Sequence, residues 1–127
     1  FNLWKFDHGF PATAAADSDS DNDGIPLLLE YALNFDPTTA STTGLPAGAI
    51  SNNSLTLTYT KVKAATDITY AAEVAGAVTG LWTSSFSAVD QSWRVTDLGA
   101  IEAVTARDRT AVSNAASRFL RLKVSQP

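Results

Sequence analysis

The chain has 127 residues, 45% of them hydrophobic and 17% charged, with a formal net charge of −4 and no cysteine. This composition is typical of one globular domain with its own core, argues against disorder and excludes a disulfide framework. No apolar run approaches the roughly 20 residues of a membrane span, and no basic cluster is typical of a nucleic-acid binder, so we expect neither kind of partner.

The first ten residues carry aromatic side chains at helical spacing. Phe1, Trp4 and His8 follow the i, i+3/i+4 pattern, and a glycine and a proline then interrupt it. We therefore predict a short helix or turn over residues 1–10 that packs on a core. His8 is the only histidine, so a histidine-based catalytic triad or zinc cluster is not expected.

Negative charge is concentrated near the N-terminus. Residues 1–36 hold seven acidic residues and one basic residue, a net −6, whereas residues 37–127 hold six acidic and eight basic residues, a net +2. A general need for solubility poorly explains charge that is placed in one short segment. The distribution therefore indicates a specific site in this segment.

Residues 19–30, DSDNDGIPLLLE, match the calcium-loop pattern D-x-[DN]-x-[DN]-G-x5-E in full. Calcium binds about six to eight oxygens at about 2.3–2.6 Å, and alternate carboxylates in a tight loop converge on one point. Gly24 permits the sharp turn, and Leu27, which has no side-chain oxygen, leaves its position to a water. The predicted calcium ligands are the side chains of Asp19, Asp21, Asp23 and Glu30 and the backbone carbonyl of Ile25.

Alternatives to a single calcium ion stay open. One is a solvated acidic loop without a metal, although five acidic side chains within residues 17–30 would repel one another strongly. Magnesium is less suitable, because its tight octahedral geometry fits a loop of many carboxylates poorly. Asp17 and Asp36 are candidates for the outer shell of the ion or for a second ion. A loop register that starts at Asp17 would place Asn22 where the glycine belongs.

The loop leads into a predicted helix over residues 26–35. Pro26 suits a first helical position, and Asp36-Pro37 ends the pattern. No entering helix precedes the loop and no second loop accompanies it. We therefore expect a structural clip rather than a calcium sensor, whose helices must reorient. The apolar stripe expected to face the core contains Leu28, Tyr31, Ala32 and Phe35.

Residues 38–53 are rich in Thr, Ser, Gly, Pro and Asn, which predicts a loop or linker. The Asn52-Asn53-Ser54 sequence fits a glycosylation sequon, which we regard as chance. From residue 54 the hydrophobic period changes to two, as in half-buried strands. The predicted strands cover residues 54–60, 68–74, 92–98, 101–108 and 118–124.

Short strands at this spacing predict a mainly β fold, an antiparallel β-sandwich of the immunoglobulin or fibronectin type III kind. The expected division is an N-terminal helical segment with the calcium loop (1–37), a loop (38–53) and the sandwich (54–127). We expect residues 1–37 to form one compact unit with the sandwich.

The stretch DSDSDNDGIPLLLEYALNFDP resembles the calcium-binding segment of bacterial thrombospondin type 3-like and dockerin-like repeats. The rest, from LTLTYT to RFLRLKV, resembles the β-rich C-terminal module that follows this segment in large secreted bacterial proteins. The resemblance covers most of the chain, implies an exported non-catalytic appendage and carries over the same five ligands. The chain does not begin with Met and shows no signal peptide, so we expect a mature or excised piece of a longer precursor.

These observations predict a calcium-binding module, secreted or at the cell surface, that stabilises, spaces or anchors a larger parent polypeptide. No nucleophile, base or oxyanion arrangement indicates an enzyme. One alternative is a subunit of a self-assembling extracellular filament or tube, in which neighbouring subunits are joined by strand addition. Another is a carbohydrate-binding module in which Trp82 and Trp93 stack on a polysaccharide.

Overall fold

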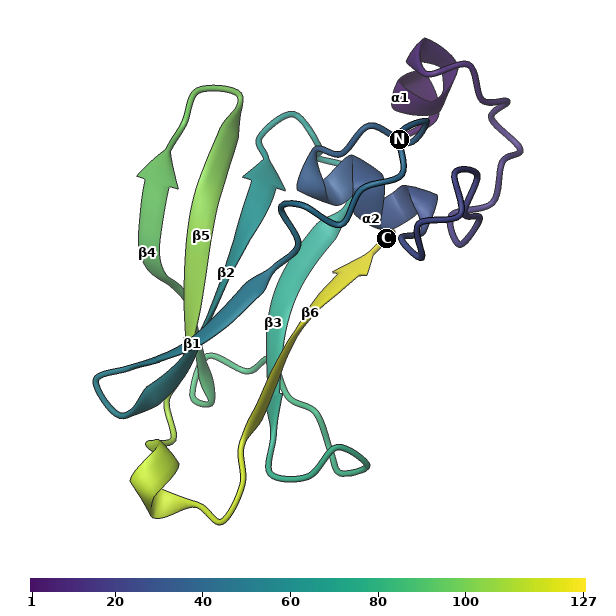
Figure 1. Ribbon diagram of the computed structural model, residues 1–127. Helices are drawn as coiled ribbons and strands as arrows, with labels where there is room; N and C mark the ends of the chain where they lie inside the picture. Colours follow the sequence, from purple (N-terminus) through teal and green to yellow (C-terminus); the bar gives the residue numbers. More distant parts are fainter.

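The computed structural model describes residues 1–127 and is mainly β, with two antiparallel sheets and few helices (Figure 1). The mainly β prediction is therefore confirmed. No helix in it has both the length and the apolar character needed to cross a bilayer. The elements are α1 (Asn2–Asp7), α2 (Leu27–Leu33), β1 (Ala47–Ser51), β2 (Ser54–Val62), β3 (Thr69–Ala75), β4 (Val89–Asp97), β5 (Ile101–Asp108), the 3-10 helix η1 (Val112–Asn114) and β6 (Phe119–Ser125).

The larger sheet has four strands in the order β1-β2-β5-β4, and the smaller sheet pairs β3 with β6. All pairings are antiparallel. The five predicted strands all form, as β2 to β6, because each has the period-two alternation that places every second side chain on one face. A β-bulge interrupts the β4–β5 pairing between Asp90 and Arg94.

Buried side chains from the two sheets pack against each other. One cluster joins Ala72 and Val74 of β3 to Val89 of β4 and Ala106 of β5. A second cluster contains Leu33 of α2, Tyr59 of β2 and Val104 of β5, and Leu122 of β6 packs on it. Full burial of one such aliphatic side chain contributes roughly 1.5–3 kcal/mol, so these contacts are the main source of sheet-to-sheet stability.

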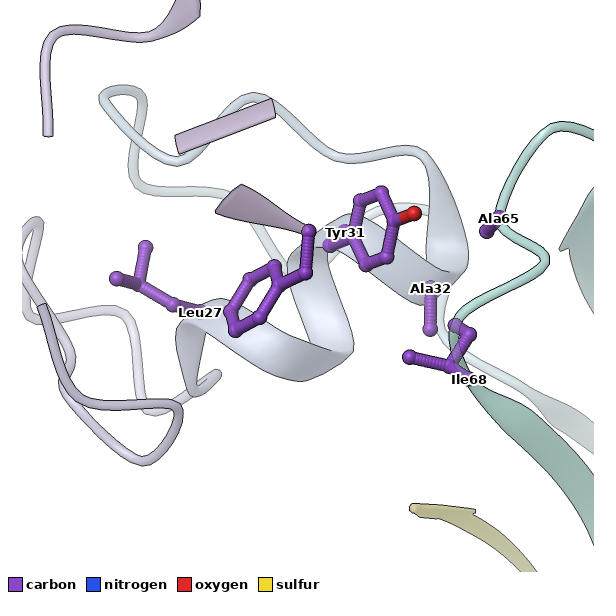
Figure 2. Close-up of a cluster of buried hydrophobic side chains, with 6 residues drawn as sticks. Leu27, Tyr31, Ala32, Ala65 and Ile68 are labelled. Atoms are coloured by element: carbon purple, nitrogen blue, oxygen red, sulfur yellow. The ribbon is translucent and has the colours of Figure 1, made fainter. Parts of the chain in front are cut away.

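Helix α2 lies across one end of the sheets (Figure 1) and carries the third core cluster (Figure 2). Leu27, Tyr31 and Ala32 are buried there with Ala65 and Ile68 from the β2–β3 connection. Two hydrogen bonds fix this contact: the Tyr31 hydroxyl donates to Asp67 Oδ1 at 2.6 Å, and the Tyr70 hydroxyl donates to the Ala32 carbonyl at 2.6 Å. The helix therefore joins the N-terminal segment firmly to the β body.

The predicted apolar stripe of this helix is confirmed, with one addition. Tyr31 and Ala32 are buried, and Leu28 and Phe35 pack at the edges of the clusters. Leu27, which the stripe did not include, is fully buried.

The predicted bounds of the helix, 26–35, are too wide. Pro26 is the N-cap with extended backbone rather than the first helical residue. Asn34 adopts the left-handed conformation with φ 64°, which ends the helix before Phe35.

The predicted loop over residues 38–53 is wrong at its C-terminal end, because Ala47–Ser51 forms β1. This strand pairs with β2 from Ala47↔Thr58 to Ser51↔Ser54. The two residues between the strands, Asn52 and Asn53, both have positive φ, 50° and 64°. Asn tolerates this conformation, and a two-residue turn with positive φ at both positions matches the right-handed twist of a hairpin.

The N-terminal residues form the short helix α1, as predicted, and tie the approach to the acidic loop. Phe1 stacks on Tyr31 with ring centroids 5.2 Å apart. The Lys5 ammonium is buried and donates to the carbonyls of Ala12 and Ala14 at 3.0 and 2.8 Å. Its charge is therefore satisfied by backbone oxygens, and the chain between α1 and residue 16 is held close to the helix.

Candidate metal centre

The acidic loop between α1 and α2 brings three carboxylates together. Oxygens of Asp19, Asp21 and Asp23 lie within 4.8 Å of one another. Their odd-numbered spacing in a tight turn produces this convergence, as the sequence pattern predicts. Such an arrangement of hard oxygen donors suits a divalent cation, and exposed acidic groups also occur without one.

Hydrogen bonds within the loop hold this geometry. Asp19 accepts the amides of Asp23 and Gly24 at 3.1 and 2.9 Å, one on each carboxylate oxygen. Asp23 Oδ1 accepts the Ile25 amide at 2.8 Å. Gly24 has φ +86°, where an L side chain would be strained although a Cβ would meet no atom within 4 Å. The glycine is therefore required by backbone conformation and not by space.

Glu30 projects from α2 and is the most unusual group at this end of the molecule. Its side chain is 0% exposed, and neither carboxylate oxygen has a hydrogen-bond partner. Both carboxylate oxygens of Asp21 are likewise buried and unpartnered. Buried polar groups are normally hydrogen-bonded, and a buried charge is costly unless it is paired. Four unpartnered carboxylate oxygens therefore need a cation or protons.

The burial of Glu30 and the neighbouring carboxylates raise its proton affinity. Burial, and then the charges of Asp21, Asp23 and Asp19, raise the pKa of Glu30 from 4.5 to about 7. Burial and the neighbouring Asp23 also raise the pKa of Asp21. In contrast, the Ile25 amide that Asp23 accepts lowers the pKa of Asp23. Glu30 thus lies within the field of the three loop carboxylates.

The backbone at Ile25 and Leu27 connects the loop to the start of α2. The Ile25 carbonyl accepts no backbone hydrogen bond, which leaves this oxygen free to bind an ion. Leu27 is buried in the core, and its amide donates to the Ser18 carbonyl at 2.9 Å. The Leu28 amide donates to the Ala16 carbonyl at 3.0 Å. The start of α2 is therefore bound directly to the entry of the loop.

The two outer candidates have different surroundings. Both are exposed. Asp36 accepts hydrogen bonds from the Thr38 amide, the Thr38 hydroxyl and the Thr39 hydroxyl, so its oxygens hold a turn, and the Thr38 contacts lower its pKa. Asp17 lines a shallow groove beside β6. Their roles in an outer shell or at a second ion stay predictions.

One contact of the loop was not predicted from the sequence. The Ser41 amide donates to Asp23 Oδ2 at 3.2 Å, so the segment between α2 and β1 lies against the acidic loop. No motif in residues 38–46 predicts this contact, because it depends on the path that the chain takes between α2 and β1.

The tryptophans do not form one row. Trp82 lies in the β3–β4 connection with the Arg121 guanidinium 4.0 Å from its ring centroid, and its indole N–H donates to the Val78 carbonyl. Trp93 lies on β4 with the Arg94 guanidinium at 4.1 Å. Both indoles are half-buried. Sugar stacking therefore stays a prediction for each.

No family model, curated protein or solved structure matches this chain. The chemistry of its own residues is therefore what indicates a function for this chain.

Proposed function

We propose that this chain is a non-catalytic calcium-binding module of a secreted or cell-surface protein. The observation that carries the proposal is the buried Glu30 carboxylate, which has no partner and lies in the field of three converging aspartates. A bound calcium ion would neutralise these charges and would use the unpartnered oxygens of Asp21 and Glu30. We further propose that the two sheets form a β-sandwich of the immunoglobulin or fibronectin type III kind.

Calcium would act here as a clip between two parts of the chain. Asp19, Asp21 and Asp23 come from the loop, whereas Glu30 comes from a helix that packs on the β body through Tyr31 and Ala32. An ion bound by both groups stabilises the folded arrangement because the unfolded chain does not present them together. The module would thereby stabilise, space or anchor the parent polypeptide to which it belongs.

The test is thermal unfolding of three proteins in calcium and in a chelator: the unmodified chain, Glu30→Gln and Asp7→Asn. At calcium one hundred times the dissociation constant, binding stabilises the native state by about 2.7 kcal/mol. We expect this gain for the unmodified chain and for Asp7→Asn, which removes an exposed carboxylate outside the loop. Glu30→Gln should lose the gain and, in chelator, be more stable than the unmodified chain.

Two results would contradict the proposal. An identical melting temperature of the unmodified chain in calcium and in chelator would mean that the loop is a metal-free acidic turn. Full retention of the calcium gain by Glu30→Gln would mean that this carboxylate is not a ligand.

A further inference from the structure

The smaller sheet has one protected edge and one open edge. The outer edge of β3 is covered, because Val74 exchanges two backbone hydrogen bonds with Thr83 at 2.9 and 3.0 Å. Gln91 of β4 continues this cover: its side-chain amide both donates to and accepts from the Ala72 backbone at 2.8 Å. No backbone hydrogen bond covers the outer edge of β6, although Asp17 and the start of α2 line a groove with the C-terminal half of this strand.

The register fixes which backbone groups of β6 are free. Val74 and Ala72 direct their N–H and C=O groups away from β6, and their cross-strand partners are Leu120 and Leu122. In an antiparallel ladder these partners direct their own groups away from β3. The N–H and C=O groups of Leu120 and Leu122 therefore point to the open edge, where no intramolecular hydrogen bond engages them. This edge can accept a further strand.

Beside this edge lies an apolar groove with a volume of about 360 Å³. The β1–β2 hairpin forms one wall through Ile50 and Leu55, and Phe119 and Leu120 of β6 form the other. No residue of β1 belongs to any of the three core clusters. Ile50 is 65% exposed. The two-stranded sheet thus leaves the inner face of β1 uncovered, next to unpaired backbone groups.

The charges and shapes of the open edges decide which strand fits this place. Two β6 strands would bring Arg121 and Lys123 of each copy together, and like charges on facing strands are destabilising. The edge of β4 is irregular, with a bulge between Asp90 and Arg94. The edge strand β1, AGAIS, has no charge and no bulge, and four of its five residues are exposed.

We propose that β1 of a second copy of this chain pairs with β6, and that β1 of the first copy pairs with β6 of the second. The arrows of β2 and β6 point the same way in Figure 1, and β1 is antiparallel to β2, so a two-fold axis along the strands makes both new pairings antiparallel. Two continuous sheets of six strands result, in the order β4-β5-β2-β1-β6-β3. Ile50 of each copy becomes covered, and the reciprocal contact closes the assembly as a dimer.

This arrangement makes a charge-specific prediction at Ala49. In β1, Gly48 and Ile50 share a face with Leu57 and Leu55, so Ala49 lies on the outer face. Leu120 and Leu122 of β6 face the core, so the alternating residues Arg121 and Lys123 lie on the outer face of this strand. In the dimer this face is continuous with the outer face of β1. A lysine at position 49 would therefore face like charges in the dimer, and a glutamate would face opposite ones.

The test is light scattering coupled to size exclusion, in calcium and in chelator, on the unmodified chain, Ala49→Lys and Ala49→Glu. We expect a species of twice the 13.4 kDa chain mass. Each dimer contains two β1–β6 pairings, so a lysine at position 49 faces like charges twice. We therefore expect Ala49→Lys to raise the dissociation constant of the dimer roughly 2- to 30-fold, whereas Ala49→Glu should not raise it. Adding Lys123→Glu to Ala49→Lys should restore the dimer.

Three results would overturn the pairing. The first is a monomer at the highest soluble concentration, the second is an equal effect of lysine and glutamate at position 49, and the third is a ladder of larger species. The predicted dimer does not depend on metal binding. The same samples are also melted in calcium and in chelator, so a failure of the dimer and a failure of calcium binding can be told apart.

Discussion

Glu30 places a carboxylate where the fold excludes water. The helix that carries it is fixed by Leu27, Tyr31 and Ala32, all buried, and the Glu30 side chain itself has no exposed surface. Its oxygens have no partner, and the loop aspartates add repulsion. A residue in this position destabilises the chain unless a cation or a proton neutralises it. The same residue that would hold the ion thus makes the metal-free protein sensitive to pH.

The pH dependence follows from the pKa of Glu30, which is raised from 4.5 to about 7 in the folded protein. The folded chain then binds this proton more tightly than the unfolded chain does. The resulting stabilisation is fully present below about pH 4.5 and is lost as the pH rises through about 7. In chelator, the free energy of unfolding should therefore fall over this window.

Urea unfolding of the metal-free chain at about pH 5 and about pH 8 measures this fall. Glu30→Gln cannot gain or lose the proton, so its difference between the two pH values should be smaller by the contribution of this carboxyl. Equal differences in the two proteins would assign the pH dependence to other groups.

The elements that the sequence predicts well are those whose pattern is local. Period-two alternation identified β2 to β6, and helical spacing identified α1 and α2. Strand β1 was missed because AGAIS has no alternation and little β propensity, and its pairing with β2 is what makes it a strand. The Asn52-Asn53 pair was the available signal, since a two-residue turn with positive φ strongly favours a hairpin.

The candidate site also has features that the local sequence predicts and features that depend on tertiary packing. Convergence of Asp19, Asp21 and Asp23 follows from spacing within one loop, and the sequence predicts it. The full burial of Glu30 and the Ser41 contact depend on how α2 and the following segment pack, so no local pattern reveals them.

At the scale of the hairpin, Asn52 is the residue to test. It has φ 50° and its side chain forms no hydrogen bond within the chain, so a substitution changes the backbone preference and little else. Asn52→Ala should destabilise the protein by up to about 1–2 kcal/mol, because alanine adopts the left-handed conformation less readily than asparagine does. Asn52→Gly should be near neutral. Urea midpoints compare the two variants, and equal midpoints would mean that the turn does not control the stability of β1.

Across the whole molecule, Gln91 joins the two sheets on the side opposite to the open β6 edge. Its amide satisfies both backbone groups of Ala72, a residue with no exposed surface, and also donates to the Ser84 carbonyl at 3.2 Å. Gln91→Met keeps the length of the side chain and removes these bonds. Unpaired buried backbone groups should then lower the free energy of unfolding by about 1–3 kcal/mol. Gln126→Met, at an exposed position, is the matched control and should have little effect.

The same variant tests whether the calcium loop and the sheets unfold as one unit. Calcium that binds only the native state adds a stabilisation fixed by its concentration and dissociation constant. Gln91 belongs to β4, on the opposite side of the β body from the loop, and additivity holds for sites without shared partners. If unfolding is a single cooperative transition, the calcium gain in kcal/mol should be the same in Gln91→Met as in the unmodified chain. A loss of the gain together with a second transition in the melt would show that α2 and the loop detach from the sheets before the sheets unfold.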